Sequence, residues 1–540
     1  MRVFQLFKPY FVKYKWRIVL FIMISLITSI SKLFIPYLSG KFIDQLITNP
    51  TKETIFTFSK IYFFIAIFQI IFSYIITIMS VKLNTEMSFS LNKNLISHLQ
   101  KIPSISLESQ NTTYLNQRVN VDSNNLINFW LSFLTGVLIN LISLIFSIYI
   151  ILKTNFWMTV CIIILIIAYY LLYRFSKIIL QKIILEQKEA NDMYISSLHE
   201  QLSKIKLIKV NNLFCFFLNR LKKSFNKLLK IKIRNQKISF IFTSSDTLIT
   251  IVFQIILFVF GGLMIIDGKL TIGTFSILSS YFSTIINSIK YFISTAGNYL
   301  DTLVTANRID EILNMSTETN GKIIIDDIVK IKLDHISFNY LTKKIINNFS
   351  YEFEKGNIYI LSGDNGRGKT TLVNLIIGLY VDNFDGKIQY NDCDIKKIDL
   401  YNTRNNISYT PQEDIVINDS IISNIMFDQN TNLKLEELKK LFSRFSFERF
   451  NNVKIDELWN TMINEHGSNY SGGEIKKLML IRTFIKNSSV IILDEPSNSL
   501  DSESKKTLIK LIEEKKDDSI IIIVTHDQDL KKIADHIIEL

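Results

Sequence analysis

The chain has 540 residues and a mass of 62.9 kDa, a length typical of two to four domains. Apolar residues make up 48% of it, and 40 Phe and 22 Tyr stand against 17 Gly and 6 Pro, which excludes a disordered or collagen-like chain. The net charge of +12 is unevenly distributed: residues 1–310 carry 32 Lys and Arg against 13 Asp and Glu, whereas residues 311–540 carry 29 against 36. The basic excess thus lies in the apolar half, which favours a membrane protein over a nucleic-acid-binding protein.

Six apolar stretches in the first half are long enough to cross a bilayer, for which about 20 residues are needed. They cover residues 16–38, 55–79, 126–152, 156–173, 240–266 and 271–296. The first follows a basic segment, as in a signal peptide, but no A-x-A-like cleavage site follows it. We therefore expect it to be retained as a span.

The basic residues predict the orientation of these spans, because loops rich in Lys and Arg stay on the cytoplasmic side. Five lie in residues 2–17, at the start of the first span, and fifteen lie between residues 174 and 237. The outer connections are short and poor in basic residues, for instance with Lys153 alone before the fourth span and Lys269 alone before the sixth. The sequence thus predicts a multi-pass protein of the cell membrane with both termini in the cytoplasm.

The two long cytoplasmic connections, residues 80–125 and 174–239, have helical periodicity. We expect the spans to continue as helices beyond the bilayer and to turn back at tips near residues 109–117 and 209–217. The second tip carries Phe214, Phe216 and Phe217 among polar neighbours. These rings would insert into a groove of another domain or, alternatively, pack on their own helix.

Lys32 and Lys290 fall within predicted spans, where a charge is costly. Lys32 lies deep in its span and would face a water-filled cavity that receives an anionic cargo, or else carry no such role. Lys290 lies near the inner end of its span, where its side chain could instead extend to the membrane surface.

A polar linker at residues 313–327 separates the membrane domain, residues 1–312, from a second domain at residues 328–540. In the second domain, short β-rich runs alternate with helical segments, which predicts an α/β fold. A strand at residues 357–360 precedes the segment Gly363-Asp364-Asn365-Gly366-Arg367-Gly368-Lys369-Thr370-Thr371, and a helix follows. This is the G-x-x-x-x-G-K-[ST] phosphate-binding loop in its required context. Lys369 would contact the β- and γ-phosphates, and Thr370 would bind Mg²⁺.

The apolar run Val490–Leu493 ends in Asp494 and Glu495, which predicts a buried strand with two carboxylates at its end. Asp494 suits a position linked to Mg²⁺, and Glu495 suits a general base that activates water. With the phosphate-binding loop, they predict a nucleotide site.

The segment Tyr470-Ser471-Gly472-Gly473-Glu474 is similar to the LSGGQ signature of ATP-binding cassette (ABC) ATPases. Tyr340, Gln412, Ser499-Leu500-Asp501 and His526 stand in the order of that family's other motifs. Landmarks of the membrane half are matched by Leu115–Arg118 with Asp122, by Glu200 and by Asn307-Arg308. With six preceding spans, the whole chain resembles a bacterial half-transporter of the ABC exporter type: an α-helical six-span membrane domain followed by an α/β P-loop NTPase domain.

The resemblance implies roles for further residues. Tyr340 would stack on adenine, and Gln412 would sense Mg²⁺ and the membrane domain. Ser471, Gly472 and Gly473 would contact the γ-phosphate held by the opposite subunit, and Glu474 would lie beside it. Glu495 is the implied catalytic carboxylate, and His526 would hold the γ-phosphate. One loop and one signature per chain require a dimer, formed with a second copy or with a related half.

Several features depart from the family pattern. Tyr470 and Glu474 replace the usual Leu and Gln of the signature, and the charge of Glu474 beside phosphate would weaken or retune closure of the site. The segment Asn464–Gly467 is similar to an exporter-specific motif with two substitutions. The chain also ends soon after His526, so we expect an abbreviated C-terminal edge.

The predicted function is ATP-driven export of a hydrophobic or amphipathic cargo, with a small peptide such as a bacteriocin as the favoured class. Lipid or drug export is the alternative, and a nucleotide-gated membrane regulator is a third class. ATP and Mg²⁺ are the expected cofactors, membrane lipid is an expected partner, and no nucleic-acid partner is expected.

Overall fold

The computed structural model describes residues 2–108, 110, 115–154, 156–340, 343–364, 366–413, 415–427, 435–447, 461–464, 467 and 469–540. It divides into two compact units: unit 1 comprises Met1–Gln100 and Gln110–Met315, and unit 2 comprises Lys101–Ser109 and Ser316–Leu540. The sequence had placed residues 101–109 in the membrane domain. They group with unit 2 because Lys101 O accepts a hydrogen bond from Glu318 N (2.7 Å) and Ile105 packs against the core of that unit.

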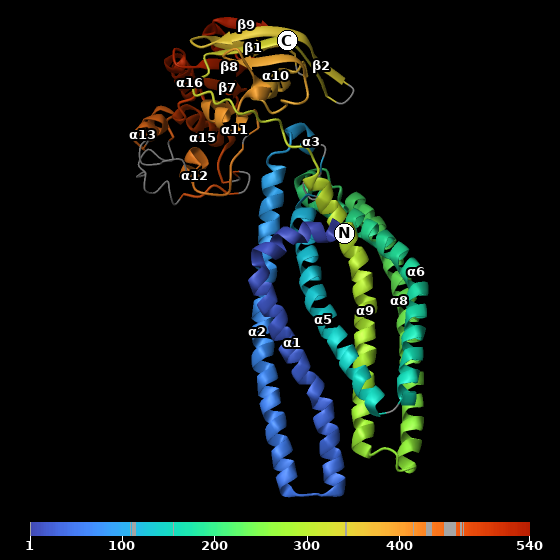
Figure 1. Cartoon of the computed structure of the whole chain (residues 1–540). Helices are drawn as coiled ribbons and strands as arrows, with labels where there is room; N and C mark the ends of the chain where they lie inside the picture. The colour runs from blue at the N-terminus through green and yellow to red at the C-terminus, as the bar shows by residue number, and fades with distance from the viewer. Residues whose placement is uncertain are drawn as a thin grey trace. The chain divides into compact units, whose positions relative to one another are not determined.

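Unit 1 is built from long helices (Figure 1). Their bounds are Arg2–Thr48 (α1), Lys52–Leu99 (α2), Ser123–Thr154 (α5), Phe156–Ser203 (α6), Phe214–Ile266 (α8) and Ile272–Leu313 (α9), with a short π-helix at Gln117–Asp122 (η1) and a short α-helix at Ile205–Val210 (α7). The 48 residues of α2 correspond to about 72 Å at 1.5 Å per residue, more than twice the ~30 Å hydrocarbon core. Helices of this length extend well beyond a bilayer, as predicted.

Neighbouring helices of unit 1 pack in antiparallel pairs, α1 with α2 and α6 with α8, and α9 packs against α1 and α5 (Figure 1). The turns before α2 and α9 are short and capped. The hydroxyls of Thr51 and Thr271 accept hydrogen bonds from the backbone N–H groups of Thr54 and Thr274 at 3.2 and 3.1 Å. Such N-caps satisfy amides that the first helical turn leaves unpaired.

Among the described residues, five helices are long and apolar enough to cross a membrane: Leu6–Thr48, Lys52–Leu99, Gln117–Thr154, Phe156–Arg174 and Phe214–Ile266. Helix α9, which carries the sixth predicted span, does not meet that criterion. Its exposed side chains include Ser283, Asn287 and Ser294, at helical spacing along one face. The use of α9 as a span remains a prediction.

Lys32 and Lys290, which lie in predicted spans, have different surroundings. Lys290 of α9 forms an ion pair with Asp246 of α8, with 2.9 Å between Nζ and Oδ2. The backbone carbonyl of Asp246 also accepts a hydrogen bond from the Tyr169 hydroxyl of α6 at 3.3 Å. A compensating charge thus accompanies Lys290 within unit 1. Asp246 was not predicted as its partner, because only the basic residues of the spans were considered. Lys32 is exposed on the surface of unit 1.

A charged cluster joins η1, α6 and α9. The buried Arg118 lies 3.0 Å from Glu311 and donates to the backbone carbonyl of Arg308 at 3.2 Å. Arg308 in turn lies 4.0 Å from Asp122 and 3.8 Å from Asp192. Burial raises the pKa of Asp122, and the Arg308 charge opposes that shift. Three family landmarks of the sequence, Arg118, Asp122 and Arg308, therefore lie together.

The second predicted tip is a tight turn between α7 and α8, at residues 211–213. Phe214 and Phe216 are exposed, whereas Phe217 is buried and its backbone carbonyl accepts from Gln201 at 2.6 Å. Two of the three aromatic rings are thus available to a partner, and the third packs within unit 1. The first predicted tip, residues 109–117, includes Ser109 and residues 111–114, which lie outside the described residues, and a short helix at Ser104–Glu108 (α3) precedes it.

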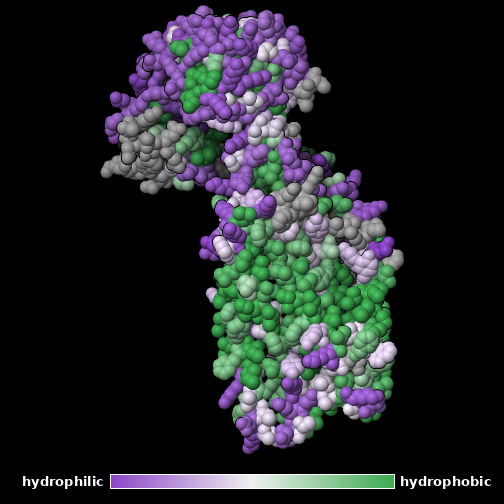
Figure 2. Space-filling model, in the orientation of Figure 1, coloured by the Kyte–Doolittle hydropathy of each residue, from purple (hydrophilic) through white to green (hydrophobic). Residues whose placement is uncertain are grey.

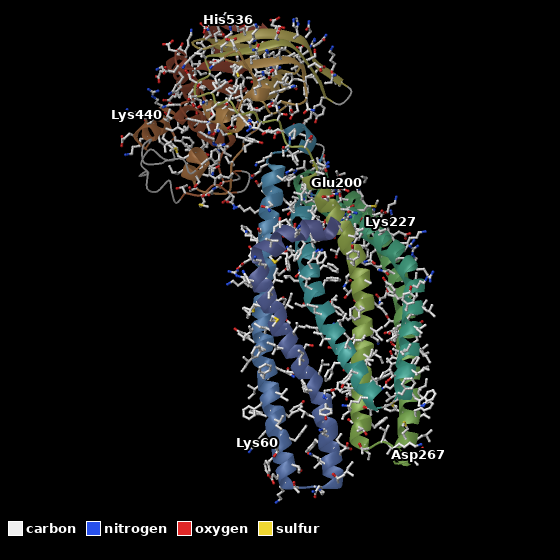
Figure 3. All side chains as sticks on the ribbon, viewed as in Figure 1. Lys60, Glu200, Lys227, Asp267, Lys440 and His536 are labelled. Carbon is white, nitrogen blue, oxygen red and sulfur yellow. The ribbon has the colours of Figure 1, made fainter. Side chains whose placement is uncertain are left out.

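The surface of unit 1 separates by polarity. In Figure 2, a broad hydrophobic zone on the visible face lies between hydrophilic zones at the two ends of the unit. Figure 3 places Asp267 at one end and Glu200 and Lys227 toward the other. Charge at both ends of an apolar belt is the distribution that a bilayer requires.

Unit 2 contains two sheets. The antiparallel sheet has the order β2-β1-β4-β5, and the parallel sheet has the order β6-β7-β8-β3-β9. The strands are Lys330–Tyr340 (β1), Lys343–Glu354 (β2), Ile358–Ser362 (β3), Asp385–Tyr390 (β4), Cys393–Asp394 (β5), Ile407–Thr410 (β6), Val490–Asp494 (β7), Ile520–Val524 (β8) and His536–Glu539 (β9).

Helices cover the parallel sheet. Their bounds are Lys369–Ile376 (α10), Leu400–Thr403 (α11), Ile421–Met426 (α12), Leu435–Arg444 (α13), Gly472–Ile485 (α15), Ser502–Lys515 (α16) and Gln528–Lys532 (α17), with 3₁₀ turns at Ile395–Lys397 (η2) and Arg404–Asn406 (η3). Alternate residues of each central strand enter opposite cores: Ile491 and Leu493 pack with α15, and Val490 and Ile492 pack with α10. Burial on both faces explains why β7 and β8 are continuous apolar runs.

Candidate functional site

The phosphate-binding loop connects β3 to α10. It runs from Gly363 to Gly368, and Asn365 lies outside the described residues. Gly368 has φ +95°, a conformation that side-chain-bearing residues rarely adopt, and a Cβ there would lie 2.8 Å from the Ile345 side chain. Glycine is thus required where the loop turns into the helix. The N-terminus of α10 directs its free N–H groups toward the loop, which suits an anion.

Lys369, the first residue of α10, curls back over the loop. Its Nζ donates to the backbone carbonyls of Gly363 at 2.6 Å and Asp364 at 3.1 Å, and it lies 3.4 Å from His526 Nε2. Since an ammonium can only donate, the contact with His526 requires Nε2 as acceptor. Arg367 lies on the exposed side of the loop, 3.8 Å from the carboxylate of Asp364. The loop therefore gathers positive charge where a phosphate chain would lie.

Three parallel strands end at the edge where this loop begins. Strand β3 pairs with β8, and β8 pairs with β7, so Leu361, Val524 and Asp494 lie in register. The residues that follow these strands, Gly363, His526 and Glu495, therefore share one edge. The predicted catalytic and phosphate-binding residues meet there, as ligand sites of parallel α/β sheets do.

Asp494, which is buried, and Thr370, which is exposed, meet at this edge. Asp494 is 1% exposed, and its Oδ2 accepts a hydrogen bond from the Thr370 hydroxyl at 3.3 Å. Burial raises the pKa of Asp494, opposed by the hydrogen bond from Thr370. Two hard oxygen donors side by side fit Mg²⁺, which binds one or two protein oxygens and completes its shell with water and phosphate oxygens.

Glu495 begins the turn after β7 in a left-handed conformation, with φ +46°. Its backbone N–H donates to Val524 O at 2.8 Å, which anchors the turn to β8. Thr371 follows Thr370 within the first turn of α10, and Gln412 lies in an exposed turn after β6, the strand next to β7. The left-handed backbone of Glu495 fits a functional site, where strained conformations of non-glycine residues are common.

The signature segment forms the start of α15. Ser471 is the N-cap: its hydroxyl accepts from Glu474 N at 3.3 Å, and the Glu474 carboxylate accepts from Ser471 N at 2.7 Å and from the Ser471 hydroxyl at 2.9 Å. This reciprocal capping box stabilises the helix start. Glu474 thus has a structural partner in Ser471. The S-x-x-E spacing of these two residues is a sequence signal for a helix cap, whereas we predicted only a charge beside phosphate for Glu474.

The start of α15 packs closely against Ser499 at Gly473, but not at Gly472. A Cβ on Gly473 would lie 2.7 Å from Ser499 O, whereas a Cβ on Gly472 would lie 3.9 Å from the nearest atom, Ser499 Oγ. A cavity of about 860 Å³ is lined by Ser471, Glu474 and the ion pair of Lys477 with Asp501, whose atoms are 2.8 Å apart. Lys477 lowers the pKa of Asp501, so that carboxylate stays charged. The signature, Ser499 and Asp501 therefore form one surface.

Two family descriptions match the chain. The ABC transporter transmembrane region matches residues 18–289, more than half of the chain, and the ABC transporter ATPase family matches residues 346–498. The chain belongs to the ABC transporter family. It is a half-transporter of type I exporter architecture, with one membrane domain fused to one ATPase domain, and an ABC exporter ATPase that couples ATP hydrolysis to transport.

The relatives of this exporter include transporters named for lactococcin G and for microcin J25. The Lactococcin-G-processing and transport ATP-binding protein LagD of Lactococcus lactis is 26% identical over 96% of this chain and 74% of that protein. The Microcin-J25 export ATP-binding/permease protein McjD of Escherichia coli is 24% identical over 96% of this chain and 90% of that protein. An ATP-dependent lipid A-core flippase of Aliivibrio fischeri is 28% identical over 51% of this chain and 47% of its own.

A solved structure of a bacterial Atm1-family ABC exporter with ATP bound superposes with a TM-score of 0.87 at 17% identity. The match covers 98% of this chain and 94% of that one. The likeness shows the fold of the exporter: a helical transmembrane domain followed by an ABC ATPase domain.

Tyr340, the predicted adenine-stacking residue of the exporter, is the last residue of β1 and is 39% exposed. Its hydroxyl donates to Glu108 at 2.8 Å. Glu108 was not predicted as a site residue, since it lies 232 residues away in the chain and matches no motif. The exporter-like segment Asn464–Gly467 includes residues 465 and 466, which lie outside the described residues.

Proposed function

We propose that this ABC exporter is a homodimer that exports small amphipathic peptides. The observation that carries the peptide assignment is the extent of similarity: the lactococcin and microcin transporters match 96% of the chain, whereas the matches to lipid A-core flippases cover 51% to 74% of it. The Phe- and Tyr-rich membrane half, poor in acidic residues, suits such a cargo.

The number of nucleotide-binding motifs in the chain favours a dimer. The chain contains one phosphate-binding loop and one signature segment. Half-transporters of this fold typically dimerise. A nucleotide on the loop of one copy would be enclosed by Ser471, Gly472 and Gly473 of the second copy, whose helix N-terminus favours an anion. Two copies would then hold two nucleotides. A related half-transporter in place of the second copy would satisfy the same requirement.

We assign the chemistry at the sheet edge as follows. Lys369 holds the β- and γ-phosphates, and His526 holds the γ-phosphate from the neighbouring strand end. Glu495 accepts a proton from the attacking water. Thr370, Asp494 and Gln412 are the assigned Mg²⁺ ligands, and the ion would neutralise charge on the phosphate oxygens. Tyr340 stacks on the adenine.

The Mg²⁺ assignment predicts a specific defect for Asp494→Asn. The amide keeps the size of the side chain but removes its charge, so we expect the Mg²⁺ concentration at half-maximal ATP hydrolysis to rise about tenfold or more. Titrating hydrolysis with Mg²⁺ at fixed ATP measures it. An unchanged Mg²⁺ requirement would remove Asp494 from the ligand set.

The proposed topology places the second tip in the cytoplasm, and the chain offers a native reporter there. Cys215 is an exposed free thiol on the first turn of α8. We expect a membrane-impermeant maleimide to label Cys215 in permeabilised cells and not in intact cells, with Cys215→Ser as the control. Labelling in intact cells would contradict the orientation.

The cargo class is testable by stimulation of ATP hydrolysis in lipid nanodiscs. We expect amphipathic bacteriocin peptides to raise the hydrolysis rate severalfold, and lipid A and the drug Hoechst 33342 to leave it within about twofold, because only a matching cargo would favour closure of the dimer. Glu495→Gln protein controls for contaminating hydrolysis. Stimulation by lipid A or by the drug alone would replace the peptide assignment with the corresponding one.

A further inference from the structure

Glu108 is the last residue of α3 and bridges two tyrosines of unit 2. Its Oε2 accepts from the Tyr340 hydroxyl at 2.8 Å, and its Oε1 accepts from the Tyr380 hydroxyl at 3.0 Å. Hydrogen bonds to a carboxylate are stronger than those between neutral groups. All three residues belong to unit 2, and the motifs of the ATPase domain do not include Glu108.

One arm of this bridge leads to the predicted adenine platform. Tyr340 pairs with Lys343, at the end of the β1–β2 hairpin where β1 ends and β2 begins. Two residues farther along β2, the side chain of Ile345 lies against Gly368 of the phosphate-binding loop. The ring of Tyr340 is thus carried by the same hairpin that borders the loop. Its hydroxyl is fixed by Glu108, while 39% of the residue remains exposed for stacking.

The other arm leads to the helix of the phosphate-binding loop. The ring of Tyr380 stacks on Phe338, with centroids 5.1 Å apart, and its hydroxyl accepts from Asn374 of α10 at 3.2 Å. Burial raises the pKa of Tyr380 to about 12, and the bond to Glu108 raises the pKa of Tyr340. Both hydroxyls therefore remain protonated donors at neutral pH.

We propose that Glu108 is a positioning residue that fixes the ring of Tyr340 for base recognition. The proposal rests on the proposed role of Tyr340 in stacking on adenine. Without the carboxylate, Tyr340 keeps its ring but loses the bond that orients it, and stacking then has to order the ring during binding. The contribution of Glu108 is consequently confined to nucleotides that carry a base, and the triphosphate chain binds independently of it.

The test compares ATP with inorganic tripolyphosphate on the full-length protein in nanodiscs. For Glu108→Ala and for Tyr340→Phe, we expect the KM for MgATP to rise about three- to tenfold and kcat to stay within twofold. The double variant should show no further rise, because both changes remove the same bond. Glu108→Gln keeps an acceptor and should recover much of the affinity. The matched control is Glu352→Ala, which removes an exposed carboxylate that pairs with Lys330 on the same hairpin.

Tripolyphosphate separates positioning from general damage. Its inhibition constant should be the same for Glu108→Ala as for the unchanged protein. The proposal would be overturned if the inhibition constant of tripolyphosphate rose in parallel with the KM for ATP. It would also be overturned if both the inhibition constant and the KM for ATP were unchanged. Additive effects of Glu108→Ala and Tyr340→Phe would overturn it as well. If Tyr340→Ala also leaves the KM for ATP unchanged, the adenine assignment fails, which is a separate outcome.

Discussion

Replacing Glu495 by Gln is expected to reduce ATP hydrolysis by about two to three orders of magnitude while MgATP affinity stays within about twofold. A general base contributes about 10²–10⁴-fold to such a step, and the amide cannot take the proton. The turn that carries Glu495 is anchored by its own N–H on Val524 O at 2.8 Å, so the backbone should be unchanged in the variant. Phosphate release and nucleotide binding, measured on the same preparation, give the two quantities.

Glu513→Gln provides the matched control for this variant, since Glu513 is an exposed carboxylate on α16, away from the edge that Glu495 shares with His526. It should hydrolyse ATP at the unchanged rate. If Glu495→Gln retains hydrolysis within threefold of the unchanged protein, Glu495 is not the base.

Gly473→Ala is expected to reduce hydrolysis by about tenfold to a hundredfold. The added methyl group would lie 2.7 Å from Ser499 O, a backbone atom that cannot rotate away. Overpacking of this kind costs about 1–3 kcal/mol, and the helix start that we propose to face the second copy would have to shift. The rate of hydrolysis at saturating MgATP is the relevant measurement, because the loop of the same chain is unaltered.

Gly472→Ala is the matched comparison, since its methyl group would lie 3.9 Å from the nearest atom, an ordinary van der Waals contact. We expect its loss to be at least severalfold smaller than that of Gly473→Ala. Equal losses in the two variants would show that the packing against Ser499 is not the cause.

The sequence predicted those parts of the site that are local in the chain. The loop from Gly363 to Gly368, its strand and its helix are contiguous, and β7 delivers Asp494 and Glu495 because an apolar run must be buried on both faces. In the structure, Thr370 and Asp494 are joined directly, although 124 residues separate them. The order of strands in the parallel sheet brings them together. The sequence predicted that the two segments form one nucleotide site, but not this strand order.

Other contacts could not be predicted from local pattern. The bridge from Glu108 to Tyr340 depends on residues 101–109 belonging to unit 2 rather than to unit 1. The periodicity of the sequence does not predict this grouping. The pair of Asp246 with Lys290 depends on the rotation of α8 against α9. By contrast, the capping box of Ser471 and Glu474 is a local S-x-x-E pattern that is visible in the sequence, although we predicted only a charge beside phosphate for Glu474.

In the proposed exporter, two copies enclose two nucleotides, each between the loop of one copy and the signature of the other. The most direct measurement is the mass of the detergent-purified Glu495→Gln protein with MgATP under native conditions. We predict a complex of twice the 62.9 kDa chain that carries two ATP molecules, and loss of the bound nucleotide when Gly473→Ala is added. A single chain that retains ATP, or a dimer whose ATP content is unaffected by Gly473→Ala, would contradict the account.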